Sequence, residues 1–235
     1  MKWEGRRQSG NVQDRRGKGG GAAVGGLGLV AVLIFTLLTG DPRALINLGL
    51  NASANINTEY VETPKEKELA EFVSVVLADT EDVWHAVFEK NQMNYQEPEL
   101  ILFKQSVRSG CGVASSDVGP FYCPADQSIY IDLGFHQELK NQFEVEGDFA
   151  MAYVVAHEVG HHVQNLLGIS DQVHKLRGEL SEKEYNRILK RLELQADYLA
   201  GVWAHYQENN NLLEVEDIPT AMQAASAIGD DRIQE

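Results

Sequence analysis

One short motif in a long apolar segment constrains this chain more than any other feature. His157-Glu158-Val159-Gly160-His161 lies inside the run 149–167, whose other residues are mostly aliphatic or aromatic. Such a run predicts a helix of about five turns that is buried nearly all round, with Asp148 as its N-cap and Gly168 as its stop. Burying two histidines and a glutamate without partners is costly, so the helix needs a group that they can bind.

The spacing of the motif points to a metal ion as that group. On a helix, His157 and His161 lie one turn apart on the same face, where two neutral imidazoles can hold Zn²⁺. Glu158 lies about 100° round the helix, so it does not complete the chelate. It can instead take a proton from a water that the metal activates, as in zincin hydrolases. An isolated match to this motif also arises by chance, and the apolar surroundings favour the metal site.

A catalytic zinc site needs a third protein ligand. The metzincin layout would place a glycine three residues after the second histidine and another histidine three residues further on, but Gln164 and Leu167 occupy these positions. That layout is excluded. His162 points about 100° away from His161 on the helix and is predicted to pack rather than to bind metal.

The best candidate for the third ligand lies on a later helix. This helix begins with a capping box formed by Ser181 and Glu184. Glu193 and Asp197 lie one turn apart on one of its faces, beside apolar residues that favour burial. We predict that Glu193 completes the ligand set and that Asp197 accepts the second ring N–H of a ligand histidine, His157. The alternative is that both carboxylates face solvent on a highly charged helix.

The first 39 residues predict a tail and a membrane anchor. Residues 1–21 carry six basic residues and no apolar periodicity, as expected of a disordered cytoplasmic tail. Residues 22–39 are uncharged and would span about 27 Å as a helix, close to the thickness of a bilayer core. By the positive-inside rule, this single-pass anchor in the cytoplasmic (inner) membrane places the following domain on the periplasmic or extracellular side. A cleaved signal peptide and a buried helix are the alternatives.

The charge beyond the anchor argues against a nucleic-acid partner. The whole chain has a formal charge of −15, and residues 40–235 carry about −19. Such a surface repels a phosphate backbone. Residues 40–62 are rich in asparagine and are predicted to form a juxtamembrane linker.

Residues 63–235 predict a mainly helical α+β domain of the zincin type with a small sheet. Its first helix begins with Thr63 as N-cap and Pro64 at the first helical position. Residues 99–103 and 128–133 have the composition of short strands. An edge strand beside the motif helix could hold an extended peptide by backbone pairing, and residues 129–133 are the candidate.

Both cysteines, Cys111 and Cys123, lie in a turn-rich loop between the two predicted strands. Their spacing is unlike that of a zinc ribbon. In an exported domain we expect them to form a disulfide that closes a loop of about 13 residues. In a reducing compartment they would be two buried free thiols.

Six segments taken together resemble the bacterial "putative neutral zinc metallopeptidase" family. They are Cys111-Gly112, Gly119 to Pro124, Tyr130 to Asp132, His157 to His162, Glu193 to Asp197 and Ala227 to Asp231. Members of this family typically have one N-terminal membrane anchor. The resemblance implies a gluzincin-type peptidase that acts on peptide or protein substrates, with Zn²⁺ at His157, His161 and Glu193 and with Glu158 as general base.

Two other classes of function stay open at this point. Family members usually continue beyond the segment that matches Ala227 to Asp231, whereas this sequence stops at Glu235. If a transition-state donor is missing, the protein would be a catalytically inactive, zinc-binding, membrane-anchored interaction protein. The other class is a helical interaction domain without metal.

Overall fold

The computed structural model describes residues 1–17, 60–143 and 148–228. They form an α+β fold that is mainly helical with a small sheet, as predicted. The predicted anchor, 22–39, and nearly all of the predicted linker lie outside the described residues. In the ranges that are described, no helix is both long enough and apolar enough to cross a membrane.

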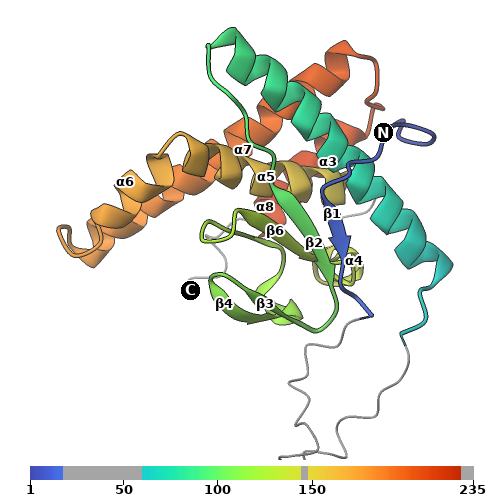
Figure 1. Cartoon of the computed structure of the whole chain (residues 1–235), viewed down its shortest axis with the longest axis horizontal. Helices are drawn as coiled ribbons and strands as arrows, with labels where there is room; N and C mark the ends of the chain where they lie inside the picture. The colour runs from blue at the N-terminus through green and yellow to red at the C-terminus, as the bar shows by residue number, and fades with distance from the viewer. Residues whose placement is uncertain (18–59, 144–147, 229–235) are drawn as a thin grey trace, which may run out of the picture. The chain divides into compact units, whose positions relative to one another are not determined.

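The motif helix α5 (Phe149–Leu166) is at the centre of the fold (Figure 1). It contacts helices α3 (Pro64–Lys90), α7 (Glu182–Asn209) and α8 (Asp217–Ile228), as well as two strands of the sheet. Most of its side chains are buried, which confirms the prediction from its composition. Gly168 follows the helix with a φ of 70°, in the left-handed region that glycine adopts without strain. The predicted stop is therefore correct.

The ends of the long helices follow local sequence signals. Thr63 and Glu66 form a capping box at the start of α3, and Ser181 and Glu184 form another at the start of α7. Asp148 occupies the N-cap position of α5, but its side chain makes no capping hydrogen bond. Its carboxylate instead binds side chains of other elements.

The sheet has four strands in the order β1-β2-β6-β5. Their bounds are Val12–Asp14 for β1, Glu99–Phe103 for β2, Ser128–Asp132 for β6 and Phe121–Cys123 for β5. β1, β2 and β6 are parallel, and β5 is antiparallel to β6. Since β6 is paired on both sides, the prediction that residues 129–133 form an edge strand is wrong. The edge strand that contacts α5 is β5, which is too short to show an alternating pattern in the sequence.

Five shorter elements complete the described fold. They are the hairpin strands β3 (Ser106–Ser109) and β4 (Gly112–Ser115), the 3-10 helix η1 (Ser116–Val118), and the helices α4 (Phe135–Phe143) and α6 (Ile169–Lys175). Alternate residues of β2 and β6 face opposite sides. Leu100 and Ile129 join the main core with α3 and α5, whereas Ile101 and Tyr130 join a smaller cluster with the hairpin.

The N-terminal segment 1–17 is part of this fold, so the predicted disordered tail is wrong for these residues. β1 pairs in register with β2, from Val12 opposite Leu100 to Asp14 opposite Leu102. Trp3 packs edge-to-face on Phe72 of α3, with ring centroids 5.6 Å apart. The N-terminal segment and the domain that follows belong to one compact unit, which consists of Met1–Arg16 and Glu62–Glu235.

Charged partners explain why a basic segment folds here. Arg6 makes two hydrogen bonds of 2.7 and 2.9 Å to the buried carboxylate of Asp79, and Arg7 lies 2.9 Å from Glu81. Glu81 is only 2 % exposed and also accepts hydrogen bonds from Ser9 and Asn11. The N-terminal segment thus covers this carboxylate. The segment therefore neutralises buried acids of α3.

The predicted disulfide between Cys111 and Cys123 is present. Cys111 lies in the turn of the β3–β4 hairpin, and Cys123 is the buried last residue of β5. The bond therefore attaches the hairpin to the edge strand.

We expect the double substitution Cys111→Ser/Cys123→Ser to lower the free energy of unfolding by about 3 kcal/mol, because the open loop gains conformational entropy in the unfolded chain. Denaturant titration of the full-length protein measures this change. The unsubstituted protein under reducing conditions is the control and should unfold at the same midpoint as the variant. A variant as stable as the oxidised protein would contradict the expectation.

Candidate metal centre

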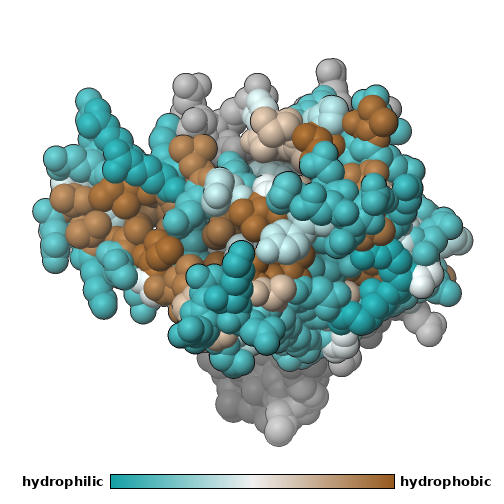
Figure 2. Space-filling view, turned by 90° about the horizontal axis from the view of Figure 1, so that it is seen from above, coloured by the Kyte–Doolittle hydropathy of each residue, from teal (hydrophilic) through white to brown (hydrophobic). Residues whose placement is uncertain are grey.

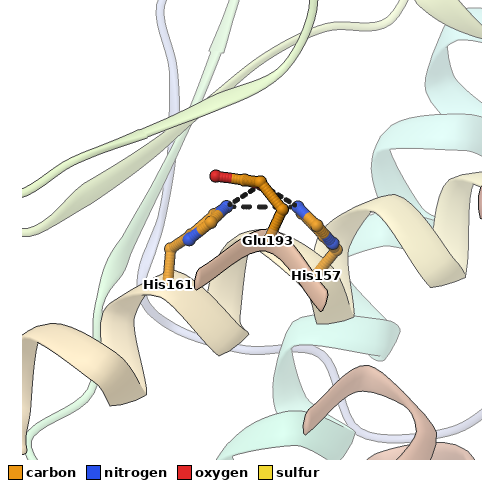
Figure 3. A group of neighbouring side chains, drawn as sticks. All are labelled: His157, His161 and Glu193. Atoms are coloured by element: carbon orange, nitrogen blue, oxygen red, sulfur yellow. Dashed lines mark hydrogen bonds and ion pairs between the residues drawn. The ribbon is translucent and has the colours of Figure 1, made fainter. Parts of the chain in front are cut away.

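Three side chains from two helices converge on one point. His157 and His161 project from α5, and Glu193 reaches them from α7 (Figure 3). The Nε2 atoms of the two histidines are 3.1 Å apart. Oε2 of Glu193 lies 3.4 Å from Nε2 of His157 and 3.2 Å from Nε2 of His161. The structure thus brings together the three residues that were predicted as ligands, although Glu193 follows the two histidines by 36 and 32 residues in the chain.

These spacings fit a zinc ion. Zinc bonds of about 2.0–2.1 Å arranged tetrahedrally place neighbouring donor atoms about 3.3 Å apart. The three observed distances lie on either side of this value. Two imidazole nitrogens and one carboxylate oxygen are also donors that zinc prefers, and they leave a fourth position open.

The charges around the imidazoles favour a cation between them. Burial lowers the pKa of His157, but hydrogen bonds to Asp197 and Glu193 outweigh it and raise this pKa to about 10. The pKa of His161 is raised in the same way, mainly by Glu193 and Glu158 against the effect of burial. The pKa of Glu193 falls to about 2 because the two histidines outweigh its desolvation. A divalent cation would supply the positive charge that these carboxylates attract.

Asp197 fixes the orientation of the His157 ring through a hydrogen bond with Nδ1, on the side of the ring away from Nε2. Nδ1 of His157 lies 2.9 Å from Oδ1 of Asp197, which can only accept, so this nitrogen carries the hydrogen and leaves Nε2 free to bind metal. The hydroxyl of Tyr153 donates to the same oxygen over 2.5 Å. Asp197 takes the predicted position, whereas Tyr153 was not foreseen. Its place one helical turn before His157 is the signal that could have identified it.

Gln164 was also missed by reasoning from the sequence. It is fully buried and contacts both His161 and α7. A buried amide three residues after a ligand histidine on an otherwise apolar helix is a recognisable signal.

Glu158 is buried next to the ligand pair. It is 8 % exposed, and its charge contributes to the raised pKa of both ligand histidines. Within the described part of the chain, its carboxylate has no hydrogen bond or ion pair. Because its oxygens are not engaged by these residues, the carboxylate can accept a proton from a small molecule beside it.

His162 does not take part in the site, as predicted from its direction on the helix. It is buried, and Nε2 lies 2.6 Å from the carbonyl oxygen of Gln96, to which it donates. Its Nδ1 accepts from the hydroxyl of Tyr122 over 3.0 Å. Burial lowers the pKa of His162 despite the bond to Gln96, so the ring is neutral. It attaches β5 to the motif helix.

The sequence matches the family described as "Putative neutral zinc metallopeptidase" over residues 1–235. The chain belongs to this family. The zinc in the family's description agrees with the His, His, Glu donor set of this member.

Relatives of this family member occur in distant bacteria. It is 45 % identical over 247 residues to "Uncharacterized protein YpfJ" of Escherichia coli strain K12, a match that covers all of this chain and 85 % of the relative. It is 44 % identical over 175 residues to "Uncharacterized protein Mb2605" of Mycobacterium bovis, covering 70 % of this chain and 58 % of that protein. No solved structure matches this chain.

The two helices that carry the candidate ligands approach each other closely at Gly160. A Cβ atom at this position would lie 2.9 Å from the carbonyl oxygen of Ala196 and 3.1 Å from its Cα. Both atoms belong to the backbone of α7, so they cannot move aside without moving the helix. Ala196 is three residues from Glu193, and the contact therefore sets how far the carboxylate reaches toward the imidazoles.

We expect Gly160→Ala to lower the free energy of unfolding by about 1–3 kcal/mol, because the added methyl group separates α5 from α7. It should also weaken zinc binding. Gly201→Ala on α7 is the matched control, since a Cβ there meets no atom within 4 Å. It should stabilise the protein by about 0.5–1 kcal/mol. Thermal unfolding and zinc titration measure both effects, and a Gly160→Ala variant that matches the control in both would contradict the expectation.

Proposed function

We propose that this family member hydrolyses peptide bonds as a zinc-dependent peptidase of the gluzincin type. The observation that carries the proposal is the convergence of His157, His161 and Glu193 at spacings suited to zinc. Three protein ligands and one open position are the pattern of catalytic zinc sites, whereas structural zinc sites use four protein ligands.

The chain's own residues supply the proton transfers. When bound, zinc supplies Lewis-acid chemistry that polarises the scissile carbonyl and activates water. Glu158 accepts a proton from the attacking water and then donates it to the nitrogen of the leaving amine. Its carboxylate returns to the ionised state at the end of each cycle. His157, His161 and Glu193 hold the ion throughout, and Asp197 keeps His157 in the required tautomer.

We propose that the peptide pairs with β5. This strand is the edge of the sheet next to the motif helix, and α5 contacts it directly. Its free side offers backbone N–H and C=O groups that an extended peptide can use as an additional strand. The hydrogen bond of Tyr122 to His162 holds this edge against α5, and the disulfide at Cys123 attaches it to the β3–β4 hairpin.

Apolar surface near the site suits a peptide or protein partner. Leu194 and Tyr198 directly follow Glu193 and Asp197 on α7 and are 65 % and 70 % exposed. Figure 2 shows further hydrophobic residues gathered over the end of the domain formed by α6 and the start of α7. Exposed apolar patches of this kind are typical of protein interaction sites.

Glu158→Gln tests the assignment of the general base. We expect cleavage of a quenched fluorescent peptide library to fall by about 10²- to 10⁴-fold, because glutamine cannot accept the proton. Zinc content should stay near one ion per chain, since Glu158 is not a ligand. The full-length protein is assayed for both, and a variant that still cleaves would reject the assignment.

Two control variants complete this experiment. Glu193→Ala should lose zinc and activity together, whereas Glu208→Gln, at an exposed position near the end of α7, should keep both. An unsubstituted protein that holds zinc but cleaves no member of the library would instead support the zinc-binding interaction protein.

We further propose that segment 1–16 and the metal-site domain share one compartment on the exported side of the cytoplasmic membrane. Support comes from β1, which pairs with β2 of the domain, and from the disulfide, which is stable in an oxidising compartment. A single crossing by the predicted anchor, 22–39, would separate β1 from β2. The pairing of β1 with β2 therefore supports placing the N-terminal segment on the same side of the membrane as the domain.

Labelling of single-cysteine probes tests this arrangement. Gln8→Cys lies in the N-terminal segment, and Asp171→Cys marks the domain; both positions are exposed, and the native cysteines are protected in their disulfide. With a membrane-impermeant maleimide on intact spheroplasts, we expect equal labelling at the two positions. Labelling of Gln8→Cys only after lysis, with Asp171→Cys labelled before it, would overturn the proposal.

A further inference from the structure

Gln164 joins the two halves of the metal site. Its Oε1 lies 3.0 Å from Nδ1 of His161, and its Nε2 donates over 2.6 Å to the carbonyl oxygen of Leu192 on α7. The same nitrogen also donates over 3.1 Å to Oε1 of Gln195. The side chain is fully buried, and Leu192 directly precedes Glu193. One amide thus contacts a ligand histidine and the backbone beside the ligand carboxylate.

The chemistry of these contacts fixes the tautomer of His161. A backbone carbonyl can only accept, so the amide NH₂ group of Gln164 must face Leu192. Its carbonyl oxygen must then face His161, and Nδ1 of that ring must carry a hydrogen. This leaves the lone pair of His161 on Nε2, the atom that lies 3.2 Å from Glu193.

The two ligand histidines are therefore oriented by different groups. Asp197, a carboxylate, accepts from His157, whereas a neutral amide accepts from His161. A second carboxylate behind His161 would add negative charge to a site that already contains Glu158, Glu193 and Asp197. The amide gives the same orientation without that charge, and it has a donor left over for α7.

We propose that Gln164 is a positioning residue that presents Nε2 of His161 to the metal by accepting a hydrogen bond from Nδ1 of that ring. This inference rests on the proposed function, because it assumes that the His157, His161 and Glu193 set binds zinc. Removing the acceptor behind a ligand histidine typically weakens metal binding by about 10- to 100-fold. A residue that only tied α5 to α7 would change stability without this selective effect.

Two substitutions separate these roles. Gln164→Met and Gln164→Glu both remove the N–H donors to α7, but only Gln164→Glu keeps an oxygen that can accept from His161. Zinc release from the full-length protein into a chromogenic chelator is measured for each. We expect Gln164→Met to release zinc about 10- to 100-fold faster than the unsubstituted protein does. Gln164→Glu should release zinc no faster than the unsubstituted protein. The visible absorption of the Co²⁺-loaded protein should change only in Gln164→Met.

Gln195→Met is the matched control, because it removes one partner of the amide and leaves both His161 and Leu192 engaged. Equal release from the two Gln164 variants, or unchanged release from Gln164→Met, would overturn the inference while the proposed function stands. An unsubstituted protein that retains no zinc would overturn both, and this result is seen before any variant is compared.

Discussion

The structure depends on the close crossing of α5 and α7 at Gly160. This glycine lets the backbone of α7 approach so closely that Glu193 reaches the imidazoles of His157 and His161. Helices that carry larger side chains at their contact pack about 8–10 Å apart between axes, and the donor atoms would then be separated. The metal site is therefore a property of a helix contact, and anything that widens the contact weakens the site.

Burying so many ionisable groups requires that each has a partner. At the candidate metal site, the imidazoles of His157 and His161 lie beside the carboxylates of Glu193 and Asp197, and a bound cation would add positive charge. On α3, burial raises the pKa of Asp79 to about 6 even though Arg6 lowers it, so the N-terminal segment is needed to neutralise this carboxylate. Without such partners, each buried charge would cost several kcal/mol. Two distant parts of the chain thus follow the same electrostatic rule.

Local contacts also hold β5 in place although it has only three residues, as its proposed role as a recognition edge requires. Its last residue, Cys123, is covalently tied to the β3–β4 hairpin, and Tyr122 is bonded to the neutral ring of His162. A free edge strand of this length would fray. These two attachments keep its backbone in place beside α5, where the proposed peptide substrate would lie.

The sequence by itself determined what depends on neighbours within one helix. The one-turn spacing of His157 and His161 and the caps of α3 and α7 follow from helical geometry and were predicted correctly. Only the tertiary structure decided the edge strand, the folded N-terminal segment and the contacts of Gln164. Each of these depends on at least one contact between residues 28 or more positions apart, such as Leu100 with Ile129, Arg6 with Asp79 or Gln164 with Leu192. No periodic pattern encodes such pairs, because they form only when separate elements pack together.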